Sequence, residues 1–314
     1  MPLHFILIFL SIFSVLNAVS AADITSVNQR ILLDIYRDNN QDLLADAPSG
    51  NEKVLDPPVL IVSFIQFEGR FISASSLINF KAHLENCIER KVIFTQSINN
   101  KSNIFALRNG RIHISEFSAG TLIEAVQQGG AIPFATSGVD MTSSENKLTV
   151  IVRSDSQYYT LSDLKNKRVA HTDENSLSGH LAAFYLLPSE GLTPEIDYNI
   201  IFSGRHVNSI RGVKSGDYDA AIVASNAIDL MTLNKEIEPH TFRTLYQSPK
   251  LKSTAFAYAH NLNSDLKSRI KTCFFNYAFS DDMKKTFFGD QKFIPIEYKT
   301  DWKEVLKIIP NLIK

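Results

Sequence analysis

Residues 168–187 read RVAHTDENSLSGHLAAFYLL, and this stretch decides the fold class. It begins as a short apolar strand at 168–171, continues through a polar loop and ends in an apolar helix at 178–187. A strand, a loop and a helix in this order form the repeating unit of α/β proteins, in which helices cover a largely parallel sheet. The stretch therefore predicts an α/β fold.

The same alternation surrounds this unit in the second half of the chain. Further strands and helices are expected at 148–153 (strand), from Leu161 (helix), at 199–202 (strand), 206–214 (helix) and 220–223 (strand). Because strands and helices take turns along this half, they predict one complete α/β lobe.

The first half of the chain opens on VLIVSF at 59–64, a continuous apolar run typical of a strand that is buried on both faces. The elements expected after it are helices near 75–87, 102–109 and 121–127, with strands at 91–95 and 112–115 between them. A late strand at 253–260 and helices at 264–279 and 301–309 are expected to return to this lobe. The first half thus predicts a second α/β lobe.

The predicted domain organisation follows from these elements and from the length, which suits two domains. Its segments are a signal peptide at 1–22, a polar segment with an acidic loop at 23–56, a first lobe at 57–149 completed by 256–314, and a second lobe at 150–255. Strands near 148–153 and 253–260 are expected to cross between the lobes. A hinge there would leave a ligand cleft between the two lobes.

The composition points to a globular protein whose partner is a small molecule. The 314 residues are 44% hydrophobic and 21% charged, enough to bury a sizeable core. Lys and Arg total 32 against 33 Asp and Glu, and the basic residues are scattered, which argues against a nucleic-acid partner. No nucleophile elbow, zinc-protease motif or phosphate-binding glycine loop is present, so a binding protein is favoured over an enzyme.

The first 22 residues, MPLHFILIFLSIFSVLNAVSAA, predict a secretory signal peptide. Their apolar run at 5–16 is followed by small residues that suit cleavage. An uncleaved apolar anchor is the alternative. No cysteine stands near the cleavage point, so we expect an exported protein that is not a bacterial lipoprotein.

Cys87 and Cys273 are the only cysteines, and both lie in amphipathic stretches. A free thiol in such a stretch is usually a small core residue. A long-range disulfide is the alternative in an oxidising compartment. The sequence leaves both open and offers no zinc-type cysteine spacing.

The loop at 172–178 is the strongest candidate for a binding site, because ligands of open α/β sheets bind beyond the carboxyl ends of strands. Ser176 and Ser178 place two hydroxyls at the start of a helix, where backbone amides lack partners and carry partial positive charge. Together with the amides of Leu177 and Ser178, they can cradle the oxygens of an oxyanion. Ordinary helix capping by either serine is the alternative.

Three further loops can add groups to the same cleft. His206 follows a strand and opens a helix, so its ring can donate to an anion, although a structural histidine is the alternative. Ser118 and Thr121 place hydroxyls at a helix start in the first lobe, where capping is again the alternative. The loop from Gln66 to Arg70 is expected to close over the ligand from the same side.

Asp219 enters a buried strand at the end of SGDYD. It can hydrogen-bond the opposite loop or an amino group of a ligand, and a purely structural role is the alternative.

An acidic loop precedes the first lobe. Asp38, Asn40, Asp42 and Asp46 occupy positions 1, 3, 5 and 9 of a calcium-loop spacing. The glycine usual at position 6 is Leu43, and no glutamate stands at position 12. A weak structural calcium site and an exposed acidic turn are the two interpretations, and no other cofactor is expected.

Four ordered stretches, taken together, resemble one protein family. They are ALRNGRIHISEF (106–117), VAHTDENSLSGHLAAFYLLPSEGL (169–192), SGRHVNSIRGVKSGDYDAAIVAS (203–225) and FIPIEYKTDWKEV (293–305). They resemble the phosphate, phosphite and phosphonate substrate-binding proteins of ABC importers, and the resemblance covers nearly all of the chain after the signal peptide. It implies the type 2 periplasmic binding protein fold.

The resemblance also implies a function and its residues. The family's anion cradle falls on Ser176, Leu177 and Ser178, its loop histidine on His206 and its strand-entering aspartate on Asp219. A monomeric periplasmic protein that captures a phosphorus oxyanion for an ABC permease and ATPase complex is thereby expected.

Some positions depart from the family pattern. Leu122 stands where a tyrosine is common, Leu177 replaces a frequent threonine, Val207 an acidic residue and His180 an asparagine. The two leucines each remove a hydroxyl. They motivate the alternative of a degenerate sensor or accessory protein of the same fold that acts through protein–protein contacts.

Overall fold

The computed structural model describes residues 32–50, 53–66, 72–97, 100–143 and 145–308. Residues from Leu32 onward belong to one compact unit, whereas the predicted signal peptide lies outside the described residues. The strands are β1 Val59–Ile65, β2 Lys91–Ser97, β3 Ile114–Ser118, β4 Ala131–Val139, β5 Thr142–Ser143, β6 Glu145–Asn146, β7 Leu148–Arg153, β8 Arg168–His171, β9 Asn199–Phe202, β10 Ala220–Ala224, β11 Phe242–Gln247, β12 Leu251–Lys252, β13 Thr254–Ala259 and β14 Lys292–Pro295. The α-helices are α2 Ala74–Ile88, α3 Asn100–Arg108, α4 Ala119–Gly129, α5 Ala182–Leu186, α6 His206–Ser215, α7 Ser225–Leu233, α8 Ser264–Phe275, α9 Asp281–Thr286, α10 Tyr298–Asp301 and α11 Lys303–Ile308, with 3₁₀ or π turns at η2 Leu161–Leu164, η3 Leu177–Leu181 and η4 Leu187–Glu190.

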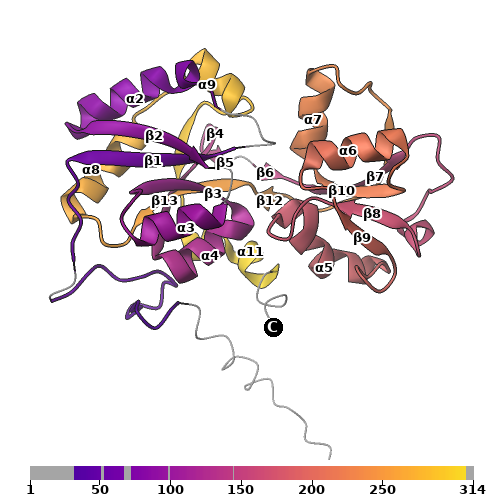
Figure 1. Ribbon diagram of the computed structural model, residues 1–314, viewed down its shortest axis with the longest axis horizontal. Helices are drawn as coiled ribbons and strands as arrows, with labels where there is room; N and C mark the ends of the chain where they lie inside the picture. Colours follow the sequence, from indigo (N-terminus) through magenta and orange to yellow (C-terminus); the bar gives the residue numbers. More distant parts are fainter. Residues whose placement is uncertain (1–31, 51–52, 67–71, 98–99, 144, 309–314) are drawn as a thin grey trace, which may run out of the picture. The chain divides into compact units, whose positions relative to one another are not determined.

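The first sheet has the strand order β14-β4-β13-β3-β1-β2, with β5 paired to β4 (Figure 1). Strands β2, β1 and β3 are parallel, as the sequence predicts for VLIVSF and the strands after it. The late strand β13 lies between β3 and β4 and runs antiparallel to both. The sheet is therefore mixed, because the returning part of the chain adds strands in the opposite direction.

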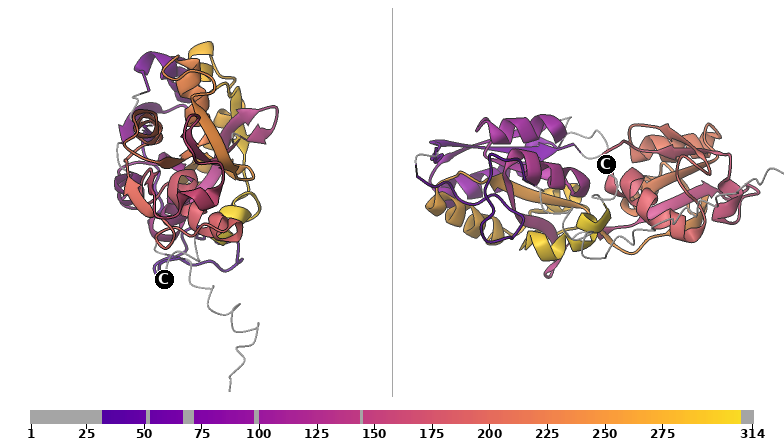
Figure 2. Two further views of the ribbon diagram at one scale, coloured as in Figure 1. Left: turned by 90° about the vertical axis from the view of Figure 1, so that its right-hand side faces the viewer. Right: turned by 90° about the horizontal axis from the view of Figure 1, so that it is seen from below.

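The second sheet has the order β11-β7-β10-β8-β9. Strands β7, β8 and β9 have the predicted bounds, and β8 pairs in parallel with both β9 and β10. β7 is antiparallel to its neighbours β10 and β11. In both views of Figure 2 the segments coloured pink to orange, from the middle of the chain, build this second sheet and its helices.

Two chain segments connect the sheets, and they pair with each other. β6 precedes β7, β12 precedes β13, and the two short strands form a two-stranded antiparallel sheet. Figure 1 shows β6 and β12 between the two larger sheets. The crossing connections predicted near 148–153 and 253–260 are therefore centred a few residues earlier in the chain.

Some elements escaped the sequence patterns. The clearest is β4, AIPFATSGV, which contains Pro133, a residue that normally argues against an interior strand. The structure places Pro133 beside an irregularity in the pairing with β13, between Phe256 and Ala257. A break in the ladder tolerates a residue that lacks an N–H group, so the strand continues past the proline.

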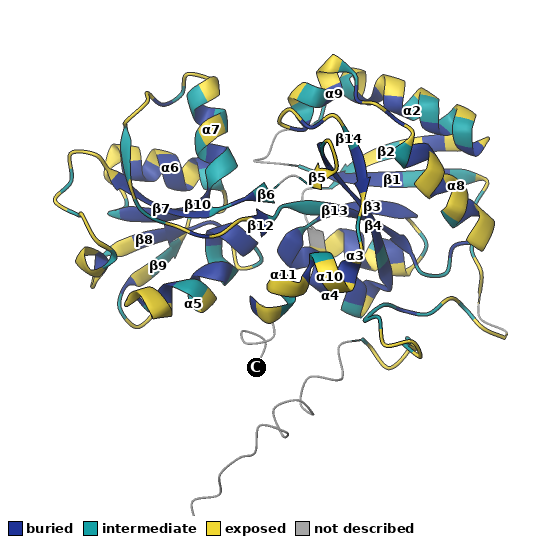
Figure 3. Cartoon of the chain, turned by 180° about the vertical axis from the view of Figure 1, so that it is seen from behind, coloured by how far each residue is buried: buried dark blue, intermediate teal, exposed yellow. Residues whose placement is uncertain are grey.

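The core lies along the strands. Figure 3 shows central strands such as β3, β7 and β10 largely buried, whereas edge strands such as β2 and β9 are partly exposed and the helices α2 and α8 expose their outer faces. In the first sheet, aromatic side chains dominate: the ring of Phe80 on α2 contacts Phe274 on α8 and Phe293 on β14, with centroids 5.2 and 5.1 Å apart. Aromatic burial on this scale makes the packing of α2 and α8 on the sheet a main source of stability.

A disulfide bond joins these two helices. Cys87 on α2 and Cys273 on α8 are bonded, with their Cα atoms 5.8 Å apart and 186 positions between them in sequence. The usual expectation of free core thiols is therefore wrong, and the alternative holds. The reason is that α2 and α8 pack side by side on one sheet, which sequence patterns alone do not reveal.

Candidate functional site

A cavity of about 490 Å³ is lined by loops from both large sheets and by the connecting strands β6 and β12. Its walls come from the ends of β1, β3 and β8, the N-termini of α4 and α6, and the turn η3. This is the location predicted for the ligand of an open α/β sheet, beyond the carboxyl ends of parallel strands.

The loop after β8 is shaped by its own hydrogen bonds. The Asp173 carboxylate accepts the Asn175 amide (2.9 Å), and the Ser176 hydroxyl accepts the Gly179 amide (3.1 Å). Gly179 is required here, because a Cβ would lie 2.1 Å from Thr172 Oγ1. The helical segment opens with the π turn η3, and its first amides, those of Leu177 and Ser178, have no intrahelical acceptor.

The predicted cradle residues line the cavity. Ser176, Leu177 and Ser178 all belong to its wall, and Ser178 is 5% exposed. Because Ser176 Oγ accepts the Gly179 amide, its own hydroxyl hydrogen can be donated elsewhere. The alternative of capping thus holds for Ser176 and does not exclude contact with a ligand.

The first-sheet side contributes Ser118 and Thr121 at the start of α4. Ser118 donates to the Thr121 hydroxyl over 3.0 Å, which leaves the Thr121 hydrogen available to another acceptor. Gly120, between them, comes so close to the second-sheet loop that a Cβ would lie 2.6 Å from the Asn175 carbonyl oxygen. The two hydroxyl-bearing helix starts therefore face one cavity.

His206 lines the cavity as a neutral donor. Its Nδ1 accepts the Ala224 amide over 3.0 Å, which places the ring hydrogen of the neutral form on Nε2. Burial lowers the pKa of His206 to about 4, so the ring is neutral near pH 7. The ring can thus donate one hydrogen bond without adding a charge.

Charged side chains that the sequence patterns did not single out also line the cavity. They are Lys101, Arg205 and Lys252, opposed by one carboxylate, that of Asp173. Lys252 Nζ is held in place by Ser143 Oγ (2.7 Å) and Glu145 Oε1 (3.2 Å). Cations therefore outnumber carboxylates on the wall, and the local field favours an anion although the whole chain is nearly neutral.

Three buried polar atoms on this wall have no hydrogen-bond partner within the part of the chain that the structure describes. They are Gln66 Nε2, Asn146 Oδ1 and Thr172 Oγ1. Leaving a buried donor or acceptor unpaired costs about 1–3 kcal/mol. The residues that carry these atoms line one cavity, although the atoms themselves are covered by neighbouring protein atoms.

Asp219 has a structural role, contrary to the candidate ligand contact. Its carboxylate accepts the Arg168 amide over 2.9 Å and lies 3.4 Å from both Arg168 Nε and the Tyr158 hydroxyl. It does not line the cavity. The cause is that Asp219 stands at the start of β10, whereas ligands bind at the carboxyl ends of such strands.

His180 lies behind the cradle loop and not in the cavity wall. Its Nδ1 is 2.9 Å from Nδ1 of His171, whose Nε2 lies 2.9 Å from the Tyr198 hydroxyl. Burial, with His180 nearby, lowers the pKa of His171 to about 3, so this pair is neutral. Where the family pattern has asparagine, this chain therefore ties η3 to β8.

The acidic loop uses its own N–H groups to satisfy its carboxylates. Asp38 accepts the amides of Asp42 and Leu43, and Asp46 accepts both the amide and the side chain of Asn39. The Asn40 side chain donates to Asp42. Among the described residues, no group of three or more His, Cys, Asp or Glu is placed to hold a metal ion. Calcium binding by this loop stays a prediction.

The cavity wall contains most of the ligand candidates predicted from the sequence, and also residues that the sequence patterns did not single out. Seven of the eight ligand candidates line the cavity: Gln66, Ser118, Thr121, Ser176, Leu177, Ser178 and His206. The rest of the Gln66 loop, 67–70, lies outside the described residues. Of the missed groups, Thr172 had a signal, because it is the first polar residue after a buried strand. Lys101, Asn146 and Lys252 stand far apart in the sequence and had none.

A family model described as "ABC transporter, phosphonate, periplasmic substrate-binding protein" matches residues 74–302. Within the described ranges, no helix is both long enough and apolar enough to span a membrane.

Solved structures share the fold. PhnD1 from Prochlorococcus marinus, in complex with methylphosphonate, is 21% identical with a TM-score of 0.68; the match covers 82% of this chain and 99% of that one. A binding protein component of an ABC phosphonate transporter from Pseudomonas aeruginosa is 18% identical (TM-score 0.67; 81% and 86% covered). A Xanthomonas citri protein bound to chloride is 16% identical with a TM-score of 0.66, and the match covers 82% of this chain and 99% of that one. The type 2 periplasmic binding protein fold is thereby confirmed.

Proposed function

Because this chain belongs to the family of periplasmic substrate-binding proteins of phosphonate ABC transporters, we propose that its cavity captures a phosphorus oxyanion for import. The ligand class is a phosphonate, with phosphite and phosphate as smaller members of the same chemistry. The protein delivers it, as a monomer exported to the periplasm, to a permease and ATPase complex. Its role is binding and not catalysis.

The anionic head is held mainly by neutral donors. The hydroxyls of Ser178 and Thr121, the amides at the start of η3 and Nε2–H of His206 converge on one cavity. Hydrogen bonds to a charged acceptor are worth roughly 1.5–3 kcal/mol each, and a helix N-terminus adds its partial positive charge. Lys101, Arg205 and Lys252 raise the local concentration of anions.

Asn146 favours phosphorus over sulfur oxyanions. Its Oδ1 is a buried acceptor without a partner, and a phosphonate can donate to it because one oxygen keeps a proton near neutral pH. A sulfonate or sulfate is fully deprotonated and offers only acceptors. The same atom would then face a second acceptor, which is unfavourable.

Release to the transporter requires the cavity to open. The connecting strands β6 and β12 carry Asn146 and Lys252, so a hinge motion of this pair changes the wall of the cavity directly. Ligand contacts to both sheets would then favour the closed form, which the transporter recognises.

The observation that carries the proposal is the convergence of two hydroxyl-bearing helix starts on a cavity lined by three cations. Thermal unfolding of the ligand-free protein in methylphosphonate, phosphite, phosphate and sulfate tests it. Ligand at 100 times its Kd stabilises by about 2.7 kcal/mol, which raises Tm by several degrees. We expect this shift with a phosphorus oxyanion and not with sulfate.

The competing function is a sensor or accessory protein that keeps the fold without tight anion binding. Leu122, at the position where the family commonly has tyrosine, is fully buried in the core and supplies no hydroxyl to the cavity. Equal Tm in all four anions would favour this second function.

A further inference from the structure

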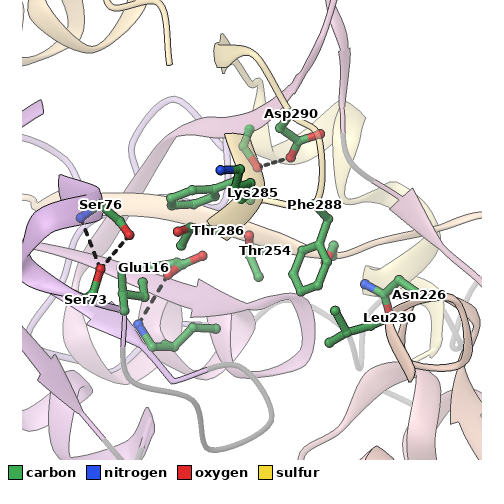
Figure 4. A pocket seen from close by; sticks show the side chains of 15 residues that line it. Ser73, Ser76, Glu116, Asn226, Leu230, Thr254, Lys285, Thr286, Phe288 and Asp290 are labelled. Carbon is green, nitrogen blue, oxygen red and sulfur yellow. Dashed lines mark hydrogen bonds between the residues drawn. The ribbon is translucent and has the colours of Figure 1, made fainter. Parts of the chain in front are cut away.

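A second cavity of about 260 Å³ adjoins the anion cavity, and the two share Ile65, Ser253 and Thr254 as lining residues. We call it the side chamber. Figure 4 shows its wall, with Thr254 near the middle and Asn226 and Leu230 of α7 on one side. Because the shared residues are in contact with both spaces, an atom attached to a ligand's head can extend into the side chamber.

Apolar atoms form most of the surface of the side chamber, although polar and charged residues also line it. Ile72 stands on the first-sheet side, Leu230 comes from α7, and Phe287 and Phe288 follow α9. The anion cavity, by contrast, has three cations and four hydroxyl-bearing serine and threonine side chains of the two helix starts. An apolar wall of this kind stabilises carbon and hydrogen atoms removed from water.

The carboxylates of the side chamber already have partners. Glu116 accepts the Ile65 amide over 3.2 Å and a hydrogen bond from Thr254, while burial raises its pKa to about 7. Asp290 accepts the Ser137 hydroxyl. The same wall carries the cationic side chain of Lys285, so a ligand ammonium would meet a like charge as well as these carboxylates.

One polar atom in the side chamber does lack a partner. Asn226 Oδ1 is buried, accepts no hydrogen bond in the described part of the chain and lines this wall. This oxygen is covered by protein atoms, so a ligand hydroxyl on a short carbon chain would supply the missing donor once the Asn226 side chain turns toward the chamber.

We propose that the side chamber binds the organic substituent of the ligand, and that this substituent is uncharged, with an apolar chain that can end in a hydroxyl donated to Asn226. The inference rests on the proposed function, because the phosphonate head must occupy the anion cavity. A charged ammonium is disfavoured, since it would lose its hydration among apolar walls and would face carboxylates that are already satisfied.

A substituent series tests the proposal by isothermal titration calorimetry with methyl-, n-propyl- and 3-hydroxypropylphosphonate. Each buried methylene contributes about 0.8 kcal/mol, close to fourfold in Kd, so the propyl compound should bind roughly fifteenfold tighter than the methyl one. The hydroxypropyl compound should bind at least as tightly as the propyl one. Binding of 2-aminoethylphosphonate more tightly than n-propylphosphonate would overturn the uncharged assignment.

Two leucines on α7 provide a matched pair of variants. Leu230 lines the side chamber, whereas Leu233, three residues further along the helix, is 81% exposed and lines none of the described cavities. Leu230→Trp should abolish the tighter binding of n-propylphosphonate relative to methylphosphonate. Its Kd for methylphosphonate should stay within twofold of that of the unmodified protein. Leu233→Trp should behave like the unmodified protein and shows that a tryptophan on α7 is tolerated.

The outcomes separate the two proposals. If methylphosphonate binds but chain length has no effect, the side chamber is not a subsite and the proposed function stands. If the Leu230→Trp variant still binds n-propylphosphonate roughly fifteenfold tighter than methylphosphonate, the side chamber is not the site of the substituent. If folded protein binds none of the phosphonates, both proposals are overturned.

Discussion

The anion cavity and the side chamber meet at Ile65, Ser253 and Thr254 but differ in chemistry. The anion cavity collects hydroxyls, helix amides and three cationic side chains. The side chamber adds isoleucine, leucine and phenylalanine side chains to its polar residues, and burial raises the pKa of Glu116 on its wall to about 7. The two adjoining cavities can therefore bind two parts of one ligand, its charged head and its carbon substituent.

Because the two cavities contact different parts of the ligand, we expect one to set the overall affinity and the other to set the selectivity among ligands. The head is common to all ligands of the class, so changes in the anion cavity should alter every affinity by a similar factor. The substituent varies, so changes in the side chamber should alter the ranking of ligands.

The largest expected effect concerns Glu116 and the stability of the fold. Burial raises its folded pKa from 4.5 to about 7, so the folded state keeps a proton that the unfolded state releases. Stability therefore falls as pH rises from about 4.5 to 7, by about 3 kcal/mol in all. Glu116→Gln should remove this fall.

Urea unfolding at pH 5 and pH 8 measures that effect. The variant should be more stable than the unmodified protein by about 3 kcal/mol at pH 8, and by under about 1 kcal/mol at pH 5. Glu124→Gln, on the partly exposed face of α4, is the matched control and should show no such difference. Equal pH dependence in all three proteins would show that the side chamber is wet and not apolar.

The next effect concerns the head. Ser178→Ala removes one hydroxyl donor to a charged group, worth roughly 1.5–3 kcal/mol, so Kd for methylphosphonate should rise roughly 10- to 150-fold. Calorimetry should give the same factor for n-propylphosphonate, because the substituent lies elsewhere. Ser189→Ala, whose hydroxyl donates to the Leu186 carbonyl outside the cavity, is the control. An unchanged Kd in Ser178→Ala would remove this residue from the cradle.

The smallest effect concerns Asn146. Asn146→Leu keeps the approximate shape of the side chain and removes the acceptor, so the preference for methylphosphonate over methanesulfonate should fall by about 1 kcal/mol, or roughly fivefold. Competition binding at pH 6.5 measures the ratio directly. A ratio that stays constant would mean that Asn146 does not select the protonated oxygen.

Much of the fold could be predicted because its strands are continuous apolar runs. Strands β7, β8 and β9 were predicted to the residue, since each is a short apolar run bounded by polar residues. β4 was hidden by Pro133, which is tolerated only because the ladder with β13 is irregular there. The disulfide was undecidable because the packing of α2 against α8 depends on the whole sheet.

Some residues of the candidate site could be predicted from the sequence, and others could not. Residues 172–178 form one contiguous strand-to-helix loop, so their convergence at a helix start could be read from the sequence. Asn146 and Lys252 reach the cavity only because β6 and β12 pair between the two sheets. Asp219 looked equivalent to the loop residues in sequence, but it stands at the opposite end of its strand.

The most direct test of the central claim is calorimetry of the folded, ligand-free protein with methylphosphonate and methanesulfonate, which have similar shapes. We expect saturable binding of methylphosphonate with one site per chain, and binding of methanesulfonate at least tenfold weaker. Absence of binding to methylphosphonate, or equal binding of both anions, would contradict it. The first of these results would favour a protein that keeps the fold and acts through protein–protein contacts.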